Sequence, residues 1–202
     1  MRIGVLAVQG GVREHAETLN TLGVDVVEVR GPDDLTKLDG LVIPGGESTA
    51  IGKAVRRSGL EDGLRRFDRP MFGTCAGLNL LASGAEDAAA DQLFLGAIDV
   101  TVRRNGYGSQ ARSFEAAVRL TDGAPAGPDA ATGEGADGVV RDHDFRGVFI
   151  RAPRVVRCGP EVEVLAELDG APVLVRERDV LAAAFHPELA GDARIHRLFL
   201  SI

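Results

Sequence analysis

The sequence predicts an α/β fold with a mostly parallel central sheet and antiparallel additions in its second half. Two observations lead to this prediction. In the first 80 residues, short apolar runs rich in β-branched residues alternate with helical patterns, which is typical of buried parallel strands joined by helices. From residue 100 onward, strand candidates follow one another with few helices between them, which favours antiparallel or mixed pairing.

Composition limits the kind of protein further. The chain has 202 residues, of which 45% are hydrophobic, and we expect residues 1–202 to form one domain. The net charge of −7 argues against nucleic acid and anionic membranes as partners. The two cysteines suit neither a disulfide framework nor a metal site, so no metal or cofactor is predicted. The sequence shows no signal peptide and no membrane-spanning run, which predicts a soluble cytoplasmic protein.

The elements of the first half follow from apolar spacing and from glycine or proline at their ends. Ser48 is expected to cap the second helix, and Ser58-Gly59-Leu60-Glu61 fits a capping box for the third. The expected strands are Ile3–Val8, Val24–Val29, Leu41–Ile43 and Met71–Gly73, and the expected helices include Val12–Leu22 and Ser48–Arg57.

The second half contains short β-branched runs. A segment without periodicity, residues 122–138, is rich in Gly, Ala, Pro and Asp and is expected to be a flexible surface insertion. The expected strands are Val100–Val102, Phe114–Leu120, Val148–Ile150, Val162–Leu168, Val173–Val175 and Val180–Phe185.

The strongest chemical signal lies at Cys75. A strand runs into Gly73-Thr74-Cys75-Ala76-Gly77 and then into a helix, the arrangement of a nucleophile elbow with sulfur in place of a serine oxygen. The glycines relieve crowding at a sharp turn, and the helix start stabilises negative charge on the sulfur. The N–H group of Ala76 would face a developing oxyanion. A small structural cysteine in a glycine-rich turn is the alternative, which the two flanking glycines make the weaker one.

His186 is the candidate base for this nucleophile. It follows an apolar strand, where α/β proteins place their sites, and Glu188 could fix the tautomer of its ring. A solvated His-Pro turn is the alternative for His186 alone. The other histidines are expected to have surface or packing roles, with His15 on a solvated helix face and His196 in a terminal amphipathic helix.

The segment Pro44-Gly45-Gly46-Glu47-Ser48-Thr49 follows the third strand. Its glycines allow unusual backbone angles, and an exposed N–H group there could be a second oxyanion donor. A tight turn with Ser48 as the helix cap explains the segment equally well.

These three segments resemble the class I (triad) glutamine amidotransferases, whose glutaminase domains have a Gly-x-Cys-x-Gly elbow and a late His-Pro-Glu. Within that class the sequence looks like the glutaminase subunits of pyridoxal 5'-phosphate synthases. The matching blocks are Val8-Gln9-Gly10, Val12-Arg13-Glu14-His15, residues 44–49, residues 73–78, Arg104-Asn105 with Gly108 and Gln110, Ser113-Phe114-Glu115, residues 149–153 and residues 185–189. The resemblance implies a three-layer, flavodoxin-like fold.

The resemblance also implies a reaction, the hydrolysis of L-glutamine to L-glutamate and ammonia through a Cys75 thioester. His186, oriented by Glu188, would protonate the leaving ammonia and then activate water, and the oxyanion would rest on the N–H groups of Gly46 and Ala76. The implied substrate-binding residues are Gly46, Glu47, Ser48, Arg104, Ile150 and Arg151.

A partner is implied as well, a barrel-shaped synthase subunit in a large hetero-oligomer that uses the ammonia to build pyridoxal 5'-phosphate. The sequence departs from the family pattern at residues 122–138, where a shorter connection is expected, and at Ser109, where an arginine is expected. Two alternatives stay open, a γ-glutamyl peptide hydrolase on the same scaffold and a non-catalytic regulatory subunit.

Overall fold

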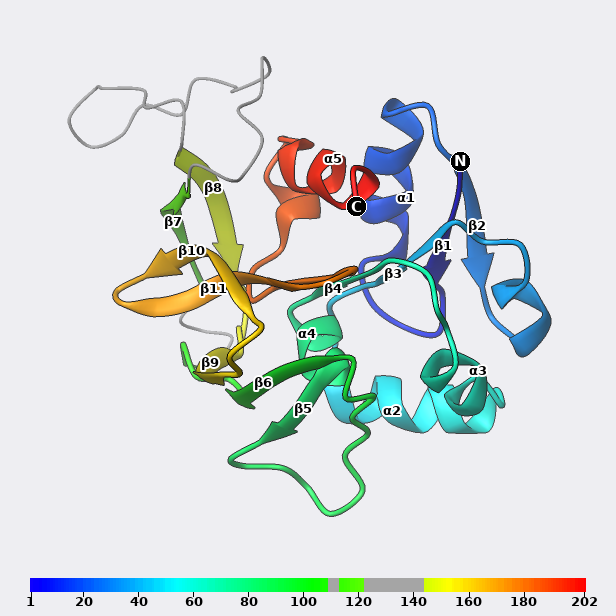
Figure 1. The fold of residues 1–202 in the computed structure, drawn as a ribbon, viewed down its shortest axis with the longest axis horizontal. Helices are drawn as coiled ribbons and strands as arrows, with labels where there is room; N and C mark the ends of the chain where they lie inside the picture. Colours follow the sequence, from blue (N-terminus) through cyan, green and yellow to red (C-terminus); the bar gives the residue numbers. More distant parts are fainter. Residues whose placement is uncertain (109–112, 122–143) are drawn as a thin grey trace.

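The computed structural model describes residues 1–108, 113–121 and 144–202. These residues form a long mixed sheet, a small second sheet and helices packed on the long sheet (Figure 1). The expected insertion at 122–138 lies outside the described residues.

The parallel half of the long sheet has the order β2-β1-β3-β4-β12. Every residue of β3, β4 and β12 is buried, as expected for central parallel strands covered on both faces. The bounds are β1 Arg2–Leu6, β2 Asp25–Val29, β3 Gly40–Ile43, β4 Met71–Thr74 and β12 Val180–Ala183.

Helices cover this half of the sheet on both faces, which gives the three layers that the family resemblance implies (Figure 1). Helices α1 and α5 lie on one face, and α2, α3 and α4 on the other. Their bounds are α1 Val12–Thr21, α2 Ser48–Arg57, α3 Glu61–Arg65, α4 Ala76–Leu81 and α5 Arg194–Leu200, with 3-10 turns η1 Pro32–Leu35 and η3 Pro187–Leu189.

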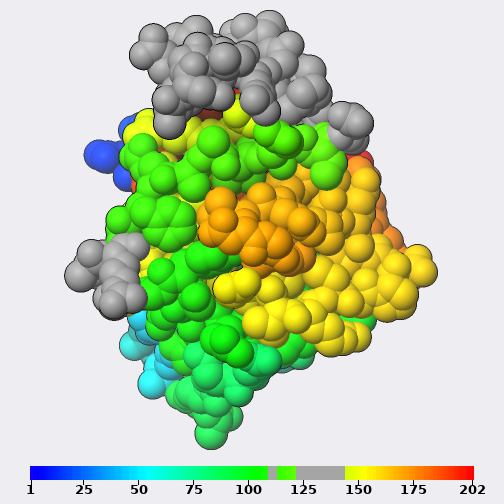
Figure 2. Space-filling model, turned by 90° about the vertical axis from the view of Figure 1, so that its left-hand side faces the viewer, coloured from blue at the N-terminus to red at the C-terminus, as the bar shows by residue number. Residues whose placement is uncertain are grey.

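The other half of the sheet is antiparallel and continues from β12 in the order β11-β10-β7-β8. Figure 2 views this end of the molecule, where green, yellow and orange segments of the second half make up most of the surface. The prediction of a parallel first half and antiparallel additions is confirmed. The bounds are β7 Phe114–Leu120, β8 Asp144–Phe149, β10 Glu163–Leu168 and β11 Ala171–Glu177.

A second sheet has the order β5-β6-β9. The predicted strand at Val100–Val102 belongs to this sheet, as part of β6 (Ile98–Arg103), and not to the long one. The sequence does not predict β5 (Ala82–Ala85), which lacks β-branched residues, or β9 (Arg154–Cys158), in which two valines lie between charged residues.

Both expected helix caps are wrong. Glu47 caps α2 in place of Ser48, with its carboxylate accepting hydrogen bonds from the N–H groups of Thr49 and Ala50 at 3.0 and 2.7 Å. The capping box at Ser58-Gly59-Leu60-Glu61 does not form, because the Ser58 hydroxyl donates to the carbonyl of Val55 and closes the end of α2. Glu61 instead pairs with arginines, at 3.2 Å from Arg56.

Strands β4 and β12 are neighbours with Met71 opposite Val180 and Thr74 opposite Ala183. Their carboxyl ends therefore lie side by side. Cys75 directly follows β4, and His186 follows β12 by three residues. Parallel pairing thus brings together two residues that are 111 positions apart in the sequence (186 − 75).

Candidate active site

Cys75 lies in a strained turn between β4 and α4. Its φ of 50° and ψ of −103° lie outside the regions that non-glycine residues ordinarily adopt. Its N–H group donates to the carbonyl of Ala183 at 2.8 Å, which joins the turn to β12. A Cβ at Gly77 would lie 2.0 Å from the carbonyl oxygen of Ile43, and one at Gly73 would lie 2.6 Å from the carbonyl carbon of Gly77. The expected nucleophile-elbow geometry is present, and its glycines have the steric cause that the sequence predicts.

His186 and Glu188 face this turn from the end of β12. The Nδ1 atom of His186 lies 2.7 Å from Oε1 of Glu188, and the ring is also hydrogen-bonded to Cys75. With Nδ1 engaged by Glu188, Nε2 is the ring nitrogen available to the thiol. A Cβ at Gly45 would lie 2.4 Å from Cε1 of His186 and 3.3 Å from Cβ of Cys75, so this glycine leaves the space that the pair occupies.

The electrostatics of the three residues favour an imidazolium paired with a carboxylate. Burial alone would lower the pKa of His186, but its hydrogen bonds to Cys75 and Glu188 raise that pKa to about 10. Burial would likewise raise the pKa of Glu188, whereas the neighbouring imidazoles of His15 and His186 lower it below its ordinary value. The Glu188 side chain is only 1% exposed, so its charge acts in surroundings that screen it little.

Ile150 lies directly against the sulfur. The Cys75 thiol donates a hydrogen bond to the Ile150 carbonyl, with an Sγ to oxygen distance of 3.6 Å. Arg151 follows with a φ of 47° and an exposed side chain. Of these two predicted substrate-binding residues, Ile150 therefore contacts Cys75, and Arg151 is the next residue in the chain.

The loop after β3 approaches the loop after β1. A Cβ at Gly10, whose φ is 100°, would lie 1.7 Å from the carbonyl oxygen of Gly45, so only glycine allows this approach. Gly46 packs against Gly10, because a Cβ atom at Gly46 would lie 3.4 Å from Cα of Gly10. Gly46 thus lies in the loop before α2, next to Gly45, whose Cβ position meets Cys75, and Ala76 is the first residue of α4, directly after Cys75.

Glu47 and Arg104 form a second group. The Nη2 atom of Arg104 lies 3.4 Å from Oε1 of Glu47 and 3.3 Å from the hydroxyl of Thr49. Partial burial would raise the pKa of Glu47, but the N–H groups of Thr49 and Ala50, together with Arg104, lower it. Ser48 is the first residue of α2 and is buried. The Glu47 carboxylate is therefore already occupied by a helix start and a guanidinium.

The expectation for His15 is wrong. Its side chain is fully buried, and its Nε2 atom lies 3.3 Å from Oε2 of Glu188. The charged neighbours Arg13, Glu14 and Glu17 suggest a solvated face, but His15 is four residues before the buried Leu19, which places both on the same side of α1. That spacing is the signal that could have revealed its burial.

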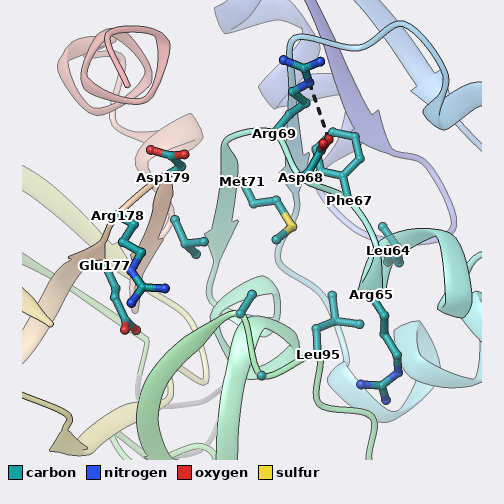
Figure 3. A pocket seen from close by; sticks show the side chains of 13 residues that line it. Leu64, Arg65, Phe67, Asp68, Arg69, Met71, Leu95, Glu177, Arg178 and Asp179 are labelled. Carbon is teal, nitrogen blue, oxygen red and sulfur yellow. Dashed lines mark ion pairs between the residues drawn. The ribbon is translucent and has the colours of Figure 1, made fainter. Parts of the chain in front are cut away.

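A cavity of about 370 Å³ lies elsewhere, at the amino ends of the same strands. Met71 and Val180, the first residues of β4 and β12, line it together with the turn between β11 and β12. Figure 3 shows Met71 between Glu177, Arg178 and Asp179 on one side and Leu64, Arg65 and Leu95 on the other. The site at Cys75 is thus separate from this hollow.

Within the described ranges, no three His, Cys, Asp or Glu side chains are arranged to hold a metal ion. Nor do those ranges include a helix with the length and apolar character needed to cross a membrane.

The fold and this arrangement of cysteine, histidine and glutamate define a class I glutamine amidotransferase. A crystal structure described as a glutamine amidotransferase superposes with a TM-score of 0.84 at 43% identity, covering 98% of this chain and 97% of that one. The structure of PurLQS from Thermotoga maritima superposes with a TM-score of 0.63 at 14% identity, covering 99% of this chain and 97% of that one, and shares the fold alone.

The chain belongs to the SNO glutamine amidotransferase family, whose profile matches residues 5–202. The pyridoxal 5'-phosphate synthase subunit PdxT of Mycobacteroides abscessus is 47% identical, covering 99% of this chain and 96% of the relative. The subunit of that name from Thermotoga maritima is 44% identical, covering 100% of this chain and 99% of the relative. The expected glutaminase family, and with it an enzyme of the glutamine amidotransferase type, is confirmed.

Proposed function

We propose that this protein is the glutaminase subunit of a pyridoxal 5'-phosphate synthase. It hydrolyses L-glutamine to L-glutamate and ammonia and supplies the ammonia to a synthase subunit. The observation that carries the proposal is the meeting of Cys75, His186 and Glu188 at the carboxyl ends of β4 and β12. Membership of the glutamine amidotransferase family indicates that the substrate is glutamine.

In the proposed mechanism, His186 takes the proton of the Cys75 thiol, the sulfur attacks the side-chain amide carbon of glutamine, and the carbonyl oxygen becomes an oxyanion. The N–H groups of Gly46 and Ala76 are the proposed donors to that oxygen. The tetrahedral intermediate collapses to a thioester as His186 protonates the departing ammonia. His186 then takes a proton from water as the water attacks the thioester, and it returns that proton to the leaving Cys75 sulfur, which releases glutamate and restores the free thiol.

Glu188 has a supporting role in this mechanism. Its hydrogen bond to Nδ1 fixes the ring so that Nε2 faces the reacting atoms, and its charge stabilises the imidazolium that forms. The hydrogen bond from the Cys75 thiol to the Ile150 carbonyl must break before attack, because the thiol gives its proton to His186 in that step.

The proposed substrate-binding residues surround the sulfur from two sides. Ile150 and Arg151 directly follow β8, whereas Gly46 and Glu47 lie in the loop after β3 and Ser48 begins α2. Arg104 and Arg151 offer guanidinium groups that suit the substrate carboxylate. Since Glu47 already pairs with Arg104, glutamine binding would rearrange this pair or use its remaining lone pairs.

The proposed partner is a barrel-shaped synthase subunit in a large hetero-oligomer. The relatives at 44 to 47% identity are named as pyridoxal 5'-phosphate synthase subunits, and they match this chain over nearly its full length. Free ammonia is readily lost to solvent, so a protected route within a complex would keep it for the synthase.

The test is to measure ammonia release from glutamine with and without the synthase subunit, using wild-type protein and Cys75→Ala. We expect strong stimulation of the wild type by the synthase subunit and no release by Cys75→Ala, which should still bind that subunit. Hydrolysis retained in the variant would refute the mechanism. Full activity without the subunit, together with turnover of γ-glutamyl peptides, would support the peptide hydrolase instead.

A further inference from the structure

Two buried histidines lie behind the candidate active site, one from each of the helices that cover that face of the sheet. His15 of α1 and His196 of α5 are both 0% exposed, and Nδ1 of His15 lies 2.9 Å from Nε2 of His196. On its other side, Nε2 of His15 lies 3.1 Å from the Thr74 hydroxyl and 3.3 Å from Oε2 of Glu188. The chain of contacts thus runs from His196 through His15 to Glu188 and His186.

Burial favours the neutral form of both rings. Burial lowers the pKa of His15, and burial together with its proximity to His15 lowers the pKa of His196 to about 3. A contact of 2.9 Å between two neutral imidazole nitrogens requires that one carries a proton and the other a lone pair. Only two arrangements of protons meet this requirement.

The surroundings decide between these arrangements. If His15 donated to His196, its own Nε2 lone pair would face the Glu188 carboxylate, and Nδ1 of His196 would carry a proton. That nitrogen is buried with no hydrogen-bond partner in the described part of the chain, so a proton there would be an unsatisfied donor. If His196 donates to His15, the Nε2–H group of His15 points to Glu188 and Thr74, and the buried Nδ1 of His196 carries a lone pair in place of an unsatisfied N–H group.

The Oε2 atom of Glu188 gives the independent reason to assign this group a role. It is buried, and among the described residues it has no hydrogen bond of good geometry. The Nε2 atom of His15 lies within ion-pair distance of it. A small shift of either side chain would make this contact a hydrogen bond while Oε1 keeps its bond to His186.

We propose that His15 is a positioning residue for glutamine hydrolysis: its Nε2–H group holds Oε2 of Glu188, so that Oε1 stays aimed at His186. His196 fixes the tautomer of His15 by donating to Nδ1. This inference rests on the proposed glutaminase function of the Cys75 site.

Neutrality of His15 is part of this role. A cationic ring beside Glu188 would compete with the His186 imidazolium for the same carboxylate, whereas a neutral N–H group orients the carboxylate and leaves its charge to His186. The ionisable groups that face His15 are Glu188, His186 and His196 from other elements and Glu14 from its own helix.

The first test compares His15→Leu, which has no donor, with His15→Gln, whose amide can donate from nearly the same position. With the synthase subunit present, His15→Leu should lower kcat for glutamine hydrolysis by about 10- to 100-fold at unchanged KM, as expected for a misplaced catalytic group. His15→Gln should restore most of that loss. Leu19→Val, one turn along α1 and equally buried, is the matched packing control and should keep the wild-type kcat.

Alkylation of Cys75 by iodoacetamide gives a measurement that does not depend on glutamine turnover. In a Cys158→Ser background, His15→Leu should slow alkylation at pH 6.5, because weaker alignment of Glu188 weakens the His186 imidazolium at the sulfur. Inactive wild-type protein would refute the proposed function alone. An active wild type with unchanged kcat and alkylation in His15→Leu would refute the positioning role.

If His15→Leu does not fold, nuclear magnetic resonance of the wild-type protein still tests the positioning role of His15. The ¹⁵N shifts of the ring nitrogens should show His15 and His196 neutral, each with its proton on Nε2, between pH 6 and 8. A proton on Nδ1 of either ring, or an imidazolium at His15, would overturn the proposal.

Discussion

The carboxyl ends and the amino ends of strands β4 and β12 lie in different surroundings. At the carboxyl ends, the backbone of Cys75 is strained, and His186 and Glu188 are mostly or fully buried. The space around them exists only because Gly45, Gly73 and Gly77 lack a Cβ atom. At the amino ends, a cavity of about 370 Å³ is lined by apolar residues such as Met71 and by exposed charged side chains such as Arg69, which pairs with its neighbour Asp68 at 3.5 Å.

The comparison shows that the cavity and the candidate catalytic residues lie at different places in this fold. A surface ion pair between flexible side chains contributes little to the free energy of unfolding and holds neither partner in a fixed geometry. The strained turn and buried carboxylate at the other end persist only because the packed strands and helices fix them. We therefore expect substitutions at the carboxyl ends to change activity and those at the amino ends to leave it unchanged.

The largest expected effect is that of His186→Asn. Loss of the proton donor and acceptor at the sulfur should lower kcat for glutamine hydrolysis by about 10⁴-fold. Steady-state ammonia release in the presence of the synthase subunit measures it. A loss of less than tenfold would show that another group acts as the base.

Glu188→Gln should have the next largest effect. The amide keeps the size of the side chain but removes the charge that stabilises the His186 imidazolium, so kcat should fall by about 10²- to 10⁴-fold. Circular dichroism and complex formation with the synthase subunit control for folding. Wild-type kcat in this variant would contradict the role given to the carboxylate.

Gly77→Ala tests the packing that supports the strained turn. The new Cβ would meet the carbonyl oxygen of Ile43 at 2.0 Å, which is backbone and has little freedom to move. We expect the free energy of unfolding to fall by about 1 to 3 kcal/mol, measured by urea denaturation. Gly84→Ala is the matched control, since no atom lies within 4 Å of its Cβ position, and equal losses in both variants would contradict the steric account.

The pH dependence of stability gives a smaller effect. Because the folded-state pKa of His186 is raised from its ordinary 6.5 to about 10, its contribution to stability is complete below pH 6.5 and is lost as the pH rises toward 10. The difference in midpoint temperature between wild type and His186→Asn should therefore narrow over that range. A difference that is constant or widens would show that the ring is not held as an imidazolium.

The smallest effect is expected for Asp179→Asn at the amino-end cavity. This exposed side chain should change the free energy of unfolding by less than about 0.5 kcal/mol and leave kcat at the wild-type value. A tenfold loss of activity would show that the two ends of the strands are coupled.

The elbow could be predicted from sequence because its physical cause is local. Glycines two residues on either side of Cys75 are a steric requirement of one turn, and His186 and Glu188 are two residues apart at a strand end. The alternation of strands and helices in the first half likewise depends on short-range apolar spacing.

Other features depend on tertiary contacts that the sequence does not display. The strand β5 has no β-branched residue and forms only because β6 pairs with it. His15 lies among charged residues, and its burial follows from the packing of α1 and α5 on one face of the sheet. The Glu47 cap depends on side-chain reach at a helix start where Ser48 is an equally plausible candidate.

The central claim is that Cys75 is the nucleophile for glutamine. The most direct measurement is labelling with a glutamine-mimicking electrophile in the presence of the synthase subunit, followed by peptide mass analysis of the modified residue. We predict one label per chain, on Cys75, with none on Cys158, whose thiol pKa is raised by burial. Labelling of Cys158 with Cys75 unmodified, or labelling that persists in Cys75→Ala, would contradict the account.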